Sequence, residues 1–251
     1  MIEFRAVSKT FTDSRGGEVA AVRGLDLTVR DGETHCLLGT SGCGKTTTLR
    51  LVNRLEEPTS GHVFVDGEDN AALDVYALRR RIGYVVQRGG LFPHMTVAEN
   101  VGIMADLEGR DRSATRERVE QLLQLVNLPY ADFSARYPAE LSGGQRQRVG
   151  VARALALDPS IVLMDEPFGA LDPITRGRIH AEFTALLAQV KKTVLLVTHD
   201  LAEAFALGDR VSIMHRGQLL QTGTRAELEA APVNAFVADF LAGHAMAGEE
   251  R

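Results

Sequence analysis

Apolar and polar residues alternate along much of residues 1–30, for example at Leu25, Leu27 and Val29. A period of two is typical of strands that bury one face. The turn-forming residues 13–17 interrupt the alternation. We therefore predict two or more strands in this region, arranged as an antiparallel edge of the fold.

Further along the chain, short continuous apolar runs alternate with longer amphipathic stretches. Such runs are typical of strands buried on both faces of a parallel sheet, with helices between them. The predicted strands are residues 34–38, 161–164 and 193–198, and the predicted helices are residues 46–55, which end before Pro58, and residues 175–190. This alternation predicts an α/β core.

A helical segment interrupts that core, because residues 96–128 and 145–157 both have helical patterns. Residues 212–223 predict a hairpin near the end of the chain. The predicted organisation is one domain of residues 1–245, with a core of residues 1–87 and 158–225, a helical subdomain at about 88–157, C-terminal helices at 225–242, and a tail at 246–251.

The composition is that of an ordinary globular chain, with 45% apolar and 24% charged residues among 251. A formal net charge of −5 argues against a nucleic-acid partner, which favours a basic protein. The longest strongly apolar runs, such as residues 161–164, are far shorter than the roughly 20 residues that cross a bilayer. The N-terminus lacks a basic segment followed by an apolar stretch, so we expect no secretory signal and folding in the cytoplasm. We interpret the two cysteines, Cys36 and Cys43, as free thiols.

A glycine-rich segment between a predicted strand and a predicted helix fits the P-loop pattern G-x-x-x-x-G-K-[ST]. Its backbone N–H groups and the positive helix end attract phosphate oxygens, the lysine reaches the β- and γ-phosphates, and the final threonine can bind Mg²⁺. The alternative is a tight turn with a solvated lysine. The segment consists of Gly39, Thr40, Ser41, Gly42, Cys43, Gly44, Lys45 and Thr46, and Thr47 follows it in the same predicted site.

Cys43 lies inside this loop, where positive backbone dipoles predict a lowered thiol pKa. We therefore hypothesise that alkylation of Cys43 blocks ATP binding. Full activity after stoichiometric modification would reject that hypothesis.

Two carboxylates, Asp165 and Glu166, directly follow the apolar strand 161–164. In an α/β sheet the carboxyl ends of the strands face the ligand. Asp165 suits Mg²⁺, and Glu166 can accept a proton from the attacking water or orient it. The alternative is a pair of solvated acids that cap the next turn.

The segment Ser142, Gly143, Gly144 and Gln145 comes at the start of a predicted helix. It offers a serine hydroxyl and unobstructed backbone amides where a helix attracts anions. We interpret it as a second phosphate-binding segment. A plain helix N-cap is the alternative.

Together these segments resemble the ABC ATPase family over almost the full length of the chain. The matching elements are residues 39–46, Gln87 in Tyr84–Gln87, Leu141–Gln145, Asp165–Glu166, Ala170–Asp172, and His199 in Thr198–Asp200. The resemblance implies an α/β fold with a P-loop NTPase core, an antiparallel β edge region and an inserted helical subdomain. It also implies ATP and Mg²⁺ as ligands. A head-to-tail homodimer is implied as well, in which Ser142, Gly143 and Gly144 of one copy close on the γ-phosphate held by the other.

The same resemblance implies roles for single residues. Gln87 senses Mg²⁺ and the water and also binds the metal, while Asp172 communicates across the dimer and contributes to the nucleotide site. His199 contacts the γ-phosphate and positions the reacting groups together with Glu166. Phe11 resembles the aromatic residue that stacks on adenine, with core packing of its ring as the alternative.

Residues 83–100 resemble the ATPases of bacterial importers, in which a groove receives a coupling helix from a separate integral-membrane permease. Phe92 and Met95 are the expected anchors, and burial of both inside the helical subdomain is the alternative. Residues 52–58, 78–83 and 165–176 are most similar to the branch that imports glycine betaine, carnitine and choline. The resemblance implies a peripheral subunit on the cytoplasmic face of the membrane, with a substrate-binding protein as an indirect partner.

Other assignments fit the sequence less well. A chromosome-structure or DNA-repair ATPase would have a long heptad insertion between Thr47 and Glu140, and the segment between them is short. An importer ATPase for another small solute, such as an amino acid, and a soluble non-transport ABC ATPase stay open. The sequence ends at Arg251 without the paired regulatory modules common in the osmoprotectant branch, so we expect osmotic control, where present, to come from elsewhere.

Overall fold

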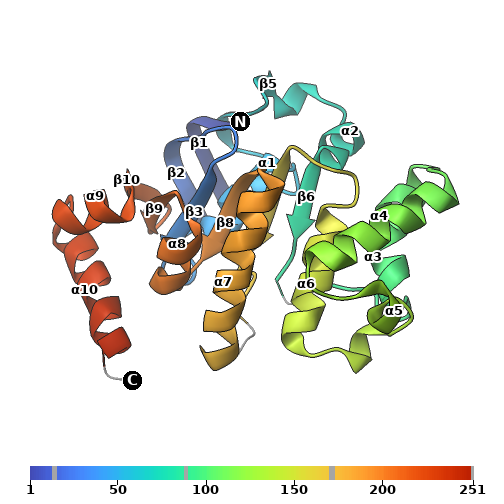
Figure 1. Cartoon of the computed structure of the whole chain (residues 1–251). Coiled ribbons are helices and arrows are strands. Elements are labelled where there is room, and N and C mark those ends of the chain that lie inside the picture. Colours follow the sequence, from blue (N-terminus) through green and yellow to red (C-terminus); the bar gives the residue numbers. More distant parts are fainter. Residues whose placement is uncertain (13–15, 88–89, 170–172, 250–251) are drawn as a thin grey trace. The chain divides into compact units, whose positions relative to one another are not determined.

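The computed structural model describes residues 1–12, 16–87, 90–169 and 173–249 (Figure 1). The chain divides into two compact units. Met1–Val75 and Thr193–Arg251 form the first unit, and Tyr76–Lys192 form the second.

The first unit contains an antiparallel sheet with the strand order β2-β1-β4-β5. Its strands are β1 (Ile2–Thr12), β2 (Glu18–Val29), β4 (Ser60–Val65) and β5 (Glu68–Asp69). The alternation at Leu25, Leu27 and Val29 does bury one face of β2. The predicted antiparallel region is therefore confirmed, and β4 and β5 extend it with strands that the alternation in residues 1–30 did not predict.

The other strands of the first unit are β3 (Thr34–Gly39), β8 (Thr193–Thr198), β9 (Arg210–His215) and β10 (Gln218–Gly223). β3 pairs in parallel with both β8 and β9, and β10 pairs antiparallel with β9. Every residue of β3 and β8 is buried, as expected of strands covered on both faces. The predicted hairpin at 212–223 begins two residues earlier, at Arg210.

The helices of the first unit are α1 (Lys45–Val52), α8 (Leu201–Leu207), α9 (Arg225–Ala230) and α10 (Ala235–Glu249), with a short 3₁₀ turn at Asn70–Ala72. Two C-terminal helices were predicted to end at Ala242. The second of them continues to Glu249, into the predicted tail.

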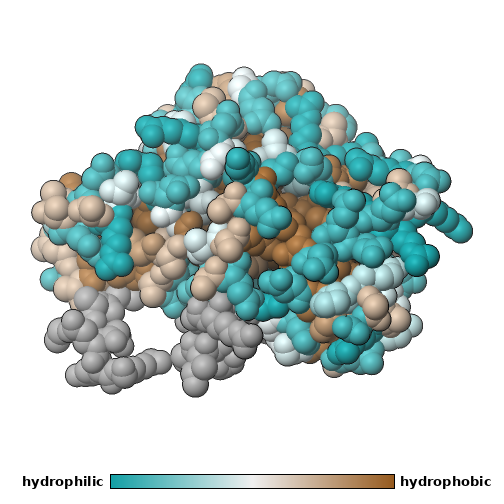
Figure 2. All heavy atoms as spheres, viewed as in Figure 1, coloured by the Kyte–Doolittle hydropathy of each residue, from teal (hydrophilic) through white to brown (hydrophobic). Residues whose placement is uncertain are grey.

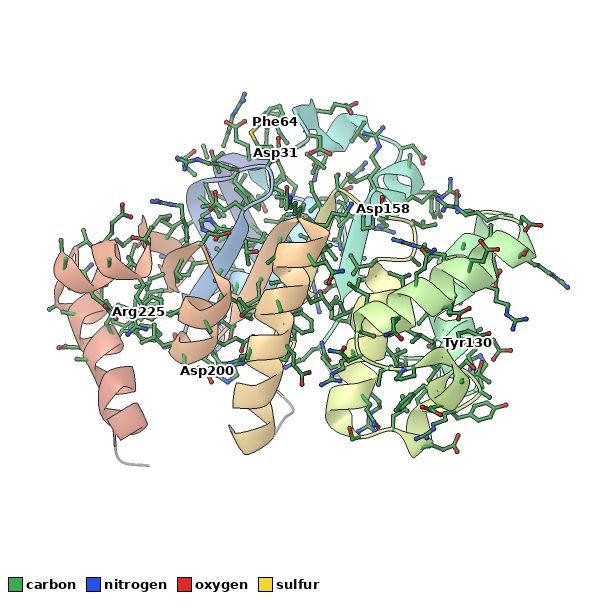
Figure 3. All side chains as sticks on the ribbon, viewed as in Figure 1. Asp31, Phe64, Tyr130, Asp158, Asp200 and Arg225 are labelled. Atoms are coloured by element: carbon green, nitrogen blue, oxygen red, sulfur yellow. The ribbon has the colours of Figure 1, made fainter. Side chains whose placement is uncertain are left out.

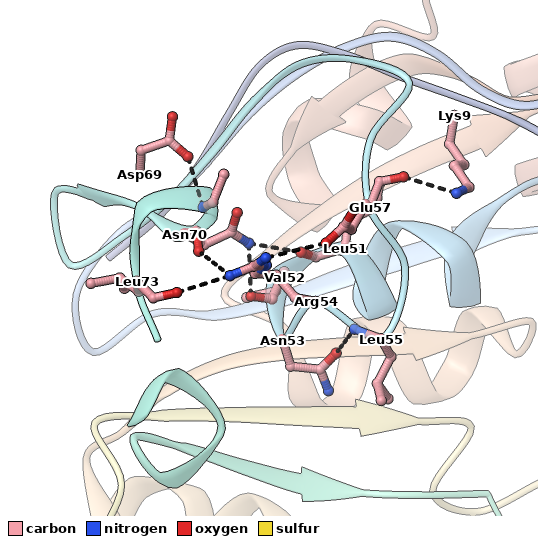
Figure 4. A network of polar contacts seen from close by, with 11 residues as sticks. Lys9, Leu51, Val52, Asn53, Arg54, Leu55, Glu57, Asp69, Asn70 and Leu73 are labelled. Atoms are coloured by element: carbon pink, nitrogen blue, oxygen red, sulfur yellow. Dashed lines mark hydrogen bonds and ion pairs between the residues drawn. The ribbon is translucent and has the colours of Figure 1, made fainter. Parts of the chain in front are cut away.

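Helix α1 ends at Val52, earlier than the predicted limit of Leu55, because a polar network terminates it (Figure 4). The amide of Asn70 donates to the carbonyls of Leu51 and Val52 at 2.8 and 3.1 Å. The backbone of Arg54 then adopts a φ of 52°, which is not helical, and its guanidinium donates to the carbonyl of Leu73 at 2.9 Å. The last carbonyls of α1 thus have partners from a distant segment instead of a further helical turn.

The second unit contains the parallel strand pair β6 (Ile82–Val85) and β7 (Ile161–Asp165). Its helices are α2 (Val75–Arg80), α3 (Val97–Leu107), α4 (Arg112–Leu125), α5 (Tyr130–Phe133), α6 (Gly143–Ala154) and α7 (Pro173–Val190), with a 3₁₀ turn at Pro138–Glu140. This unit is larger than the helical subdomain predicted at about 88–157. It also includes β6, β7 and α7, which the sequence assigned to the core.

The helical stretch predicted at 96–128 is interrupted between α3 and α4. Gly109 has a φ of +66°, a conformation that a helix excludes. The carboxylate of Asp111 then accepts hydrogen bonds from the N–H groups of Ser113 and Ala114 and starts α4 as its N-cap.

The face drawn in Figure 2 is mostly hydrophilic, with smaller hydrophobic areas among the polar side chains. Among the described residues, every helix is too short or too polar to cross a lipid bilayer.

Candidate functional site

The glycine-rich segment 39–46 forms a loop from the carboxyl end of β3 to the start of α1 in the first unit. Two of its glycines lie directly against neighbouring backbone. A Cβ atom at Gly39 would lie 2.2 Å from the carbonyl oxygen of Met214, and one at Gly44 would lie 2.1 Å from that of Ala21. Gly44 also has a φ of 106°, which side chains rarely allow. The neighbouring strands β2 and β9 thus hold the loop in place and require glycine at both positions.

Lys45 lies at the centre of this loop and is only 4% exposed. Its ammonium donates to the carbonyls of Gly39 and Thr40 at 2.7 and 3.0 Å. The solvated-lysine alternative is therefore wrong. The loop concentrates a positive charge next to the N-terminus of α1, where Thr46 and Thr47 are half-buried. Thr40, Ser41 and Gly42 form the exposed part of the loop.

Cys43 is 3% exposed, and its sulfur lies 3.8 Å from the Lys45 ammonium. Burial raises the pKa of the Cys43 thiol, although Lys45 and backbone N–H groups favour the thiolate. The predicted lowering of this pKa is therefore wrong. Desolvation of the thiolate outweighs the positive dipoles of the loop.

His199 follows β8, and its side chain is exposed. Because β8 pairs in parallel with β3, with Thr198 opposite Leu38, both strands end at the same edge of the sheet. The loop that begins at Gly39 and the loop that contains His199 therefore leave the sheet side by side. The structure brings these two predicted site elements together.

Phe11 lies near the end of β1, opposite Val19 of β2. It is 37% exposed, so the core-packing alternative is wrong. The ammonium of Lys9 lies 4.8 Å from the centre of its ring. Two residues after Val19, the carbonyl of Ala21 lies against Gly44, so Phe11 belongs to the strand pair that borders the phosphate-binding loop.

In the second unit, Gln87 and the two carboxylates gather at the carboxyl ends of β6 and β7. These strands are parallel, with Val85 opposite Met164, so the residues that follow them share one edge. The amide of Gln87 donates to Oε2 of Glu166 at 2.9 Å. Asp165 is buried and 6% exposed.

The backbone of Glu166 has a φ of 44°, in the left-handed region that favours glycine. The N–H of Gly169 donates to its carbonyl at 3.3 Å, which closes a turn around it. Strained residues of this kind concentrate at functional sites, where the surrounding structure fixes them. The turn and Gln87 together fix the direction of the Glu166 carboxylate. The alternative of two solvated acids is wrong for the buried Asp165 and stays open for Glu166, which is half-buried.

Ser142 is the N-cap of α6. Its hydroxyl accepts from the N–H of Gln145 at 3.2 Å, and the side-chain oxygen of Gln145 accepts from the N–H of Ser142 at 2.8 Å. This reciprocal pair is a capping box, so Ser142 does act as the helix N-cap, which leaves phosphate binding by the same segment open. Gly143 is half-buried and Gly144 is buried at the first turn of the helix. Contact of this segment with a nucleotide stays a prediction, and so does the role of Asp172, which lies outside the described residues.

A cavity of about 350 Å³ in the second unit lies beside β6. Phe92 lines it and is 41% exposed, so the alternative that Phe92 is buried inside the helical subdomain is wrong. Met95 is half-buried and does not line this cavity. Arg153, at the end of α6, lines the cavity too and donates to the carbonyl of Gly90 at 2.9 Å. The sequence offered no signal for Arg153, because this contact joins segments that are far apart along the chain.

Comparisons with known proteins agree with these features. The family model of the ABC transporter matches residues 22–169. The chain is 46% identical over 241 residues to the osmoprotectant import ATP-binding protein OsmV of Salmonella typhimurium. It is 47% identical over 241 residues to the glycine betaine/carnitine/choline transport ATP-binding protein OpuCA of Bacillus subtilis. Both matches cover 96% of this chain but only 63% and 62% of the relatives, so the chain spans about three fifths of their length.

Among solved structures, the chain is similar to the dimeric ATP-binding cassette MJ0796 in a post-hydrolysis state bound to ADP and Pi. The TM-score is 0.79 and the sequence identity is 33%. The match covers 89% of this chain and 98% of that one. The predicted P-loop α/β fold is therefore confirmed.

Proposed function

Because this chain belongs to the ABC transporter family, we propose that it is the ATP-hydrolysing subunit of an importer that works with a separate permease. The observation that carries this proposal is the loop 39–46. Its glycines lie against the backbone of Ala21 and Met214, and the Lys45 ammonium lies at its centre. A loop with these properties suits the β- and γ-phosphates of ATP.

The oxygen atoms of the predicted metal ligands suit Mg²⁺. Thr46 offers a hydroxyl, Gln87 an amide oxygen and Asp165 a carboxylate, and Mg²⁺ prefers a few such ligands together with phosphate oxygens. Within the described residues, no group of three or more His, Cys, Asp or Glu side chains could hold a metal ion. In this proposal the ion arrives with its nucleotide, because Mg²⁺ is usually bound by one or two protein oxygens together with substrate phosphates. When bound, Mg²⁺ would neutralise charge on the phosphates.

Glu166 orients the attacking water in this proposal, and His199 contacts the γ-phosphate. The hydrogen bond from Gln87 to Oε2 of Glu166 supports the first role, because it fixes the direction of the carboxylate. The exposed position of His199 beside the phosphate-binding loop supports the second role. Lys45 supplies the positive charge, and the exposed ring of Phe11 stacks on adenine.

The working form is a head-to-tail homodimer in which Ser142, Gly143 and Gly144 of one copy bind the nucleotide of the other. Ser142 uses a lone pair to accept from Gln145 within the capping box. Its hydroxyl hydrogen stays available to donate to a phosphate oxygen. Asp172 communicates across the dimer. The dimeric, ADP-bound state of the solved relative supports this assembly.

The cavity beside β6 receives a short amphipathic segment of the permease. Its lining includes Ile82, Val86, Phe92, Ile103, Met104 and Leu107. Arg79, Arg80 and Arg153 add positive charge at the same cavity. An apolar floor with a few polar groups is typical of a specific binding site. Binding there would place the protein peripherally on the cytoplasmic face of the membrane.

The cargo in this proposal is a quaternary-amine osmoprotectant such as glycine betaine, choline or carnitine, delivered by a substrate-binding protein. The names of the two relatives support this class. The second candidate is an importer for another small solute, such as an amino acid. The two candidates share the ATPase chemistry and differ only in the permease and its cargo.

The test is affinity purification of the tagged chain from its native membranes, followed by uptake assays in cells that lack this gene. We expect a permease to co-purify and uptake of radiolabelled glycine betaine or choline to fall, while uptake of an unrelated amino acid is unchanged. Loss of amino-acid uptake instead would favour the second candidate. Recovery of soluble DNA-associated partners without a permease would refute the transport function.

A further inference from the structure

The backbone on both sides of His199 is held by a closed ring of three hydrogen bonds in the first unit. The N–H of Asp200 donates to Oγ1 of Thr198 at 3.0 Å, and this hydroxyl donates to Oε2 of Glu203 at 2.8 Å. The N–H of Glu203 donates to Oδ1 of Asp200 at 3.1 Å, which makes Asp200 the N-cap of α8 (Figure 3). The ring therefore joins the end of β8 to the first turn of α8.

The direction of each hydrogen bond in the ring follows from the chemistry of its groups. The Thr198 hydroxyl has one hydrogen, and this hydrogen is directed to the carboxylate of Glu203. Its lone pairs are therefore available to the Asp200 N–H. Glu203 thus sets the rotation of the Thr198 hydroxyl, which in turn closes a tight turn over His199.

The ring lies in the interior, while His199 lies outside it. Thr198 is 1% exposed and Glu203 is 2% exposed, whereas the His199 side chain is exposed. Glu203 belongs to α8, which packs against β3. Burial first, and then the charges of Glu203 and Asp209, raise the pKa of the Cys36 thiol in that strand. The buried carboxylate is therefore placed against the strand that leads into the phosphate-binding loop.

We propose that Glu203, acting through Thr198, is a positioning residue that holds the His199 loop in the geometry required for ATP hydrolysis. The inference rests on the role given to His199 under the proposed function. The Thr198 hydroxyl already bonds to Glu203 and to the Asp200 N–H, so the proposal gives neither Thr198 nor Glu203 a contact with ATP. Their contribution is therefore expected in turnover, with little effect on nucleotide binding.

The matched variants are Thr198→Val, which keeps the size of the side chain and removes the hydroxyl, and Thr198→Ser, which keeps the hydroxyl. The full chain is assayed for kcat and KM of MgATP hydrolysis and for the Kd of ATP. We expect Thr198→Val to lower kcat about tenfold to a hundredfold, because a small displacement of a positioned group has effects of this size. KM and Kd should stay within about twofold, and Thr198→Ser should stay near the wild type.

Two further variants separate positioning from general stability. Glu203→Gln keeps an acceptor oxygen for Thr198 and should retain most of the turnover. In a His199→Ala background, Thr198→Val should lower kcat no further, because the effects of two substitutions that act through the same group are not additive. If Thr198→Val does not fold, Thr198→Ala removes the same hydroxyl with a smaller side chain.

The possible failures are distinguishable. A wild-type kcat in folded Thr198→Val, or its full effect in the His199→Ala background, would overturn the positioning role and leave the proposed function intact. A wild-type kcat in His199→Ala would instead overturn the role of His199 itself, and the positioning inference with it.

Discussion

The close approach of β2 to the phosphate-binding loop leads to a prediction about two glycines with contrasting surroundings. Gly44 and Gly42 both have a positive φ, of 106° and 76°, so alanine is strained at either position. A Cβ at Gly42 would meet nothing within 4 Å. At Gly44 it would lie 2.1 Å from the carbonyl oxygen of Ala21, where ordinary contacts begin at 3.4 Å.

Gly42→Ala should therefore destabilise the bound conformation of the loop only by the backbone strain, which is about 1–2 kcal/mol. Gly44→Ala has a similar strain and must also move the loop or β2 by about 1 Å, a displacement that typically costs about a hundredfold in positioned groups. We expect the affinity of Gly44→Ala for MgATP to fall by about a hundredfold more than that of Gly42→Ala, or about 2.8 kcal/mol.

The assay is equilibrium binding of a fluorescent ATP analogue to wild type and both variants, with thermal unfolding measured in parallel. Unfolding identifies any loss of binding that reflects a loss of folded protein. Equal affinities for folded Gly44→Ala and Gly42→Ala would refute the reasoning, because they would show that contact with Ala21 does not fix the loop.

Three further predictions concern the same nucleotide site. Lys45→Ala should weaken ATP binding at least about tenfold, because it removes the charge at the loop centre, and binding at the wild-type level in a titration would contradict this. Because burial raises the pKa of Cys43, its alkylation by iodoacetamide at pH 8 should be slower than that of a free thiol and should accelerate as the pH rises. Bound ATP should suppress the alkylation. Fast labelling that does not depend on ATP, measured by mass spectrometry, would contradict the buried thiol. Phe11→Ala should raise the Kd of ATP several-fold, whereas Phe11→Tyr should retain affinity, and equal Kd values for both variants would remove the ring from the adenine site.

The sequence could predict those parts of the site whose chemistry is local. The loop 39–46, the pair Asp165–Glu166 and the segment at Ser142 are each defined by a few adjacent residues, and their flanking strand or helix was also predicted. The structure accordingly places them at the end of β3, at the end of β7 and at the start of α6. Local sequence patterns are sufficient to predict a site segment where residues adjacent in the chain determine its geometry.

Properties that depend on contacts between distant segments could not be predicted from such local sequence patterns. The pKa of Cys43 was predicted with the wrong sign, because its burial raises the pKa and involves remote segments such as Gly217, whose N–H donates to the Cys43 carbonyl. Similarly, α1 ends at Val52 because Asn70 supplies an amide from a separate turn. The contact of Arg153 with Gly90 has the same origin.

The side chain of Gln145 illustrates a third kind of difference. The family resemblance placed it with the nucleotide ligands, whereas the structure uses its oxygen to hold the N–H of Ser142. A serine followed three residues later by a glutamine is itself the local sequence signal of a capping box.

The decisive measurement is the rate of MgATP hydrolysis by Glu166→Gln, made together with nucleotide binding and the size of the complex in ATP. The carboxylate held by Gln87 should be needed for chemistry and not for binding. We therefore expect ATP affinity at the wild-type level, loss of most of the turnover, and an ATP-bound dimer that persists in size-exclusion chromatography. Turnover near the wild-type rate would contradict the assignment of Glu166 and the hydrolytic site built around it.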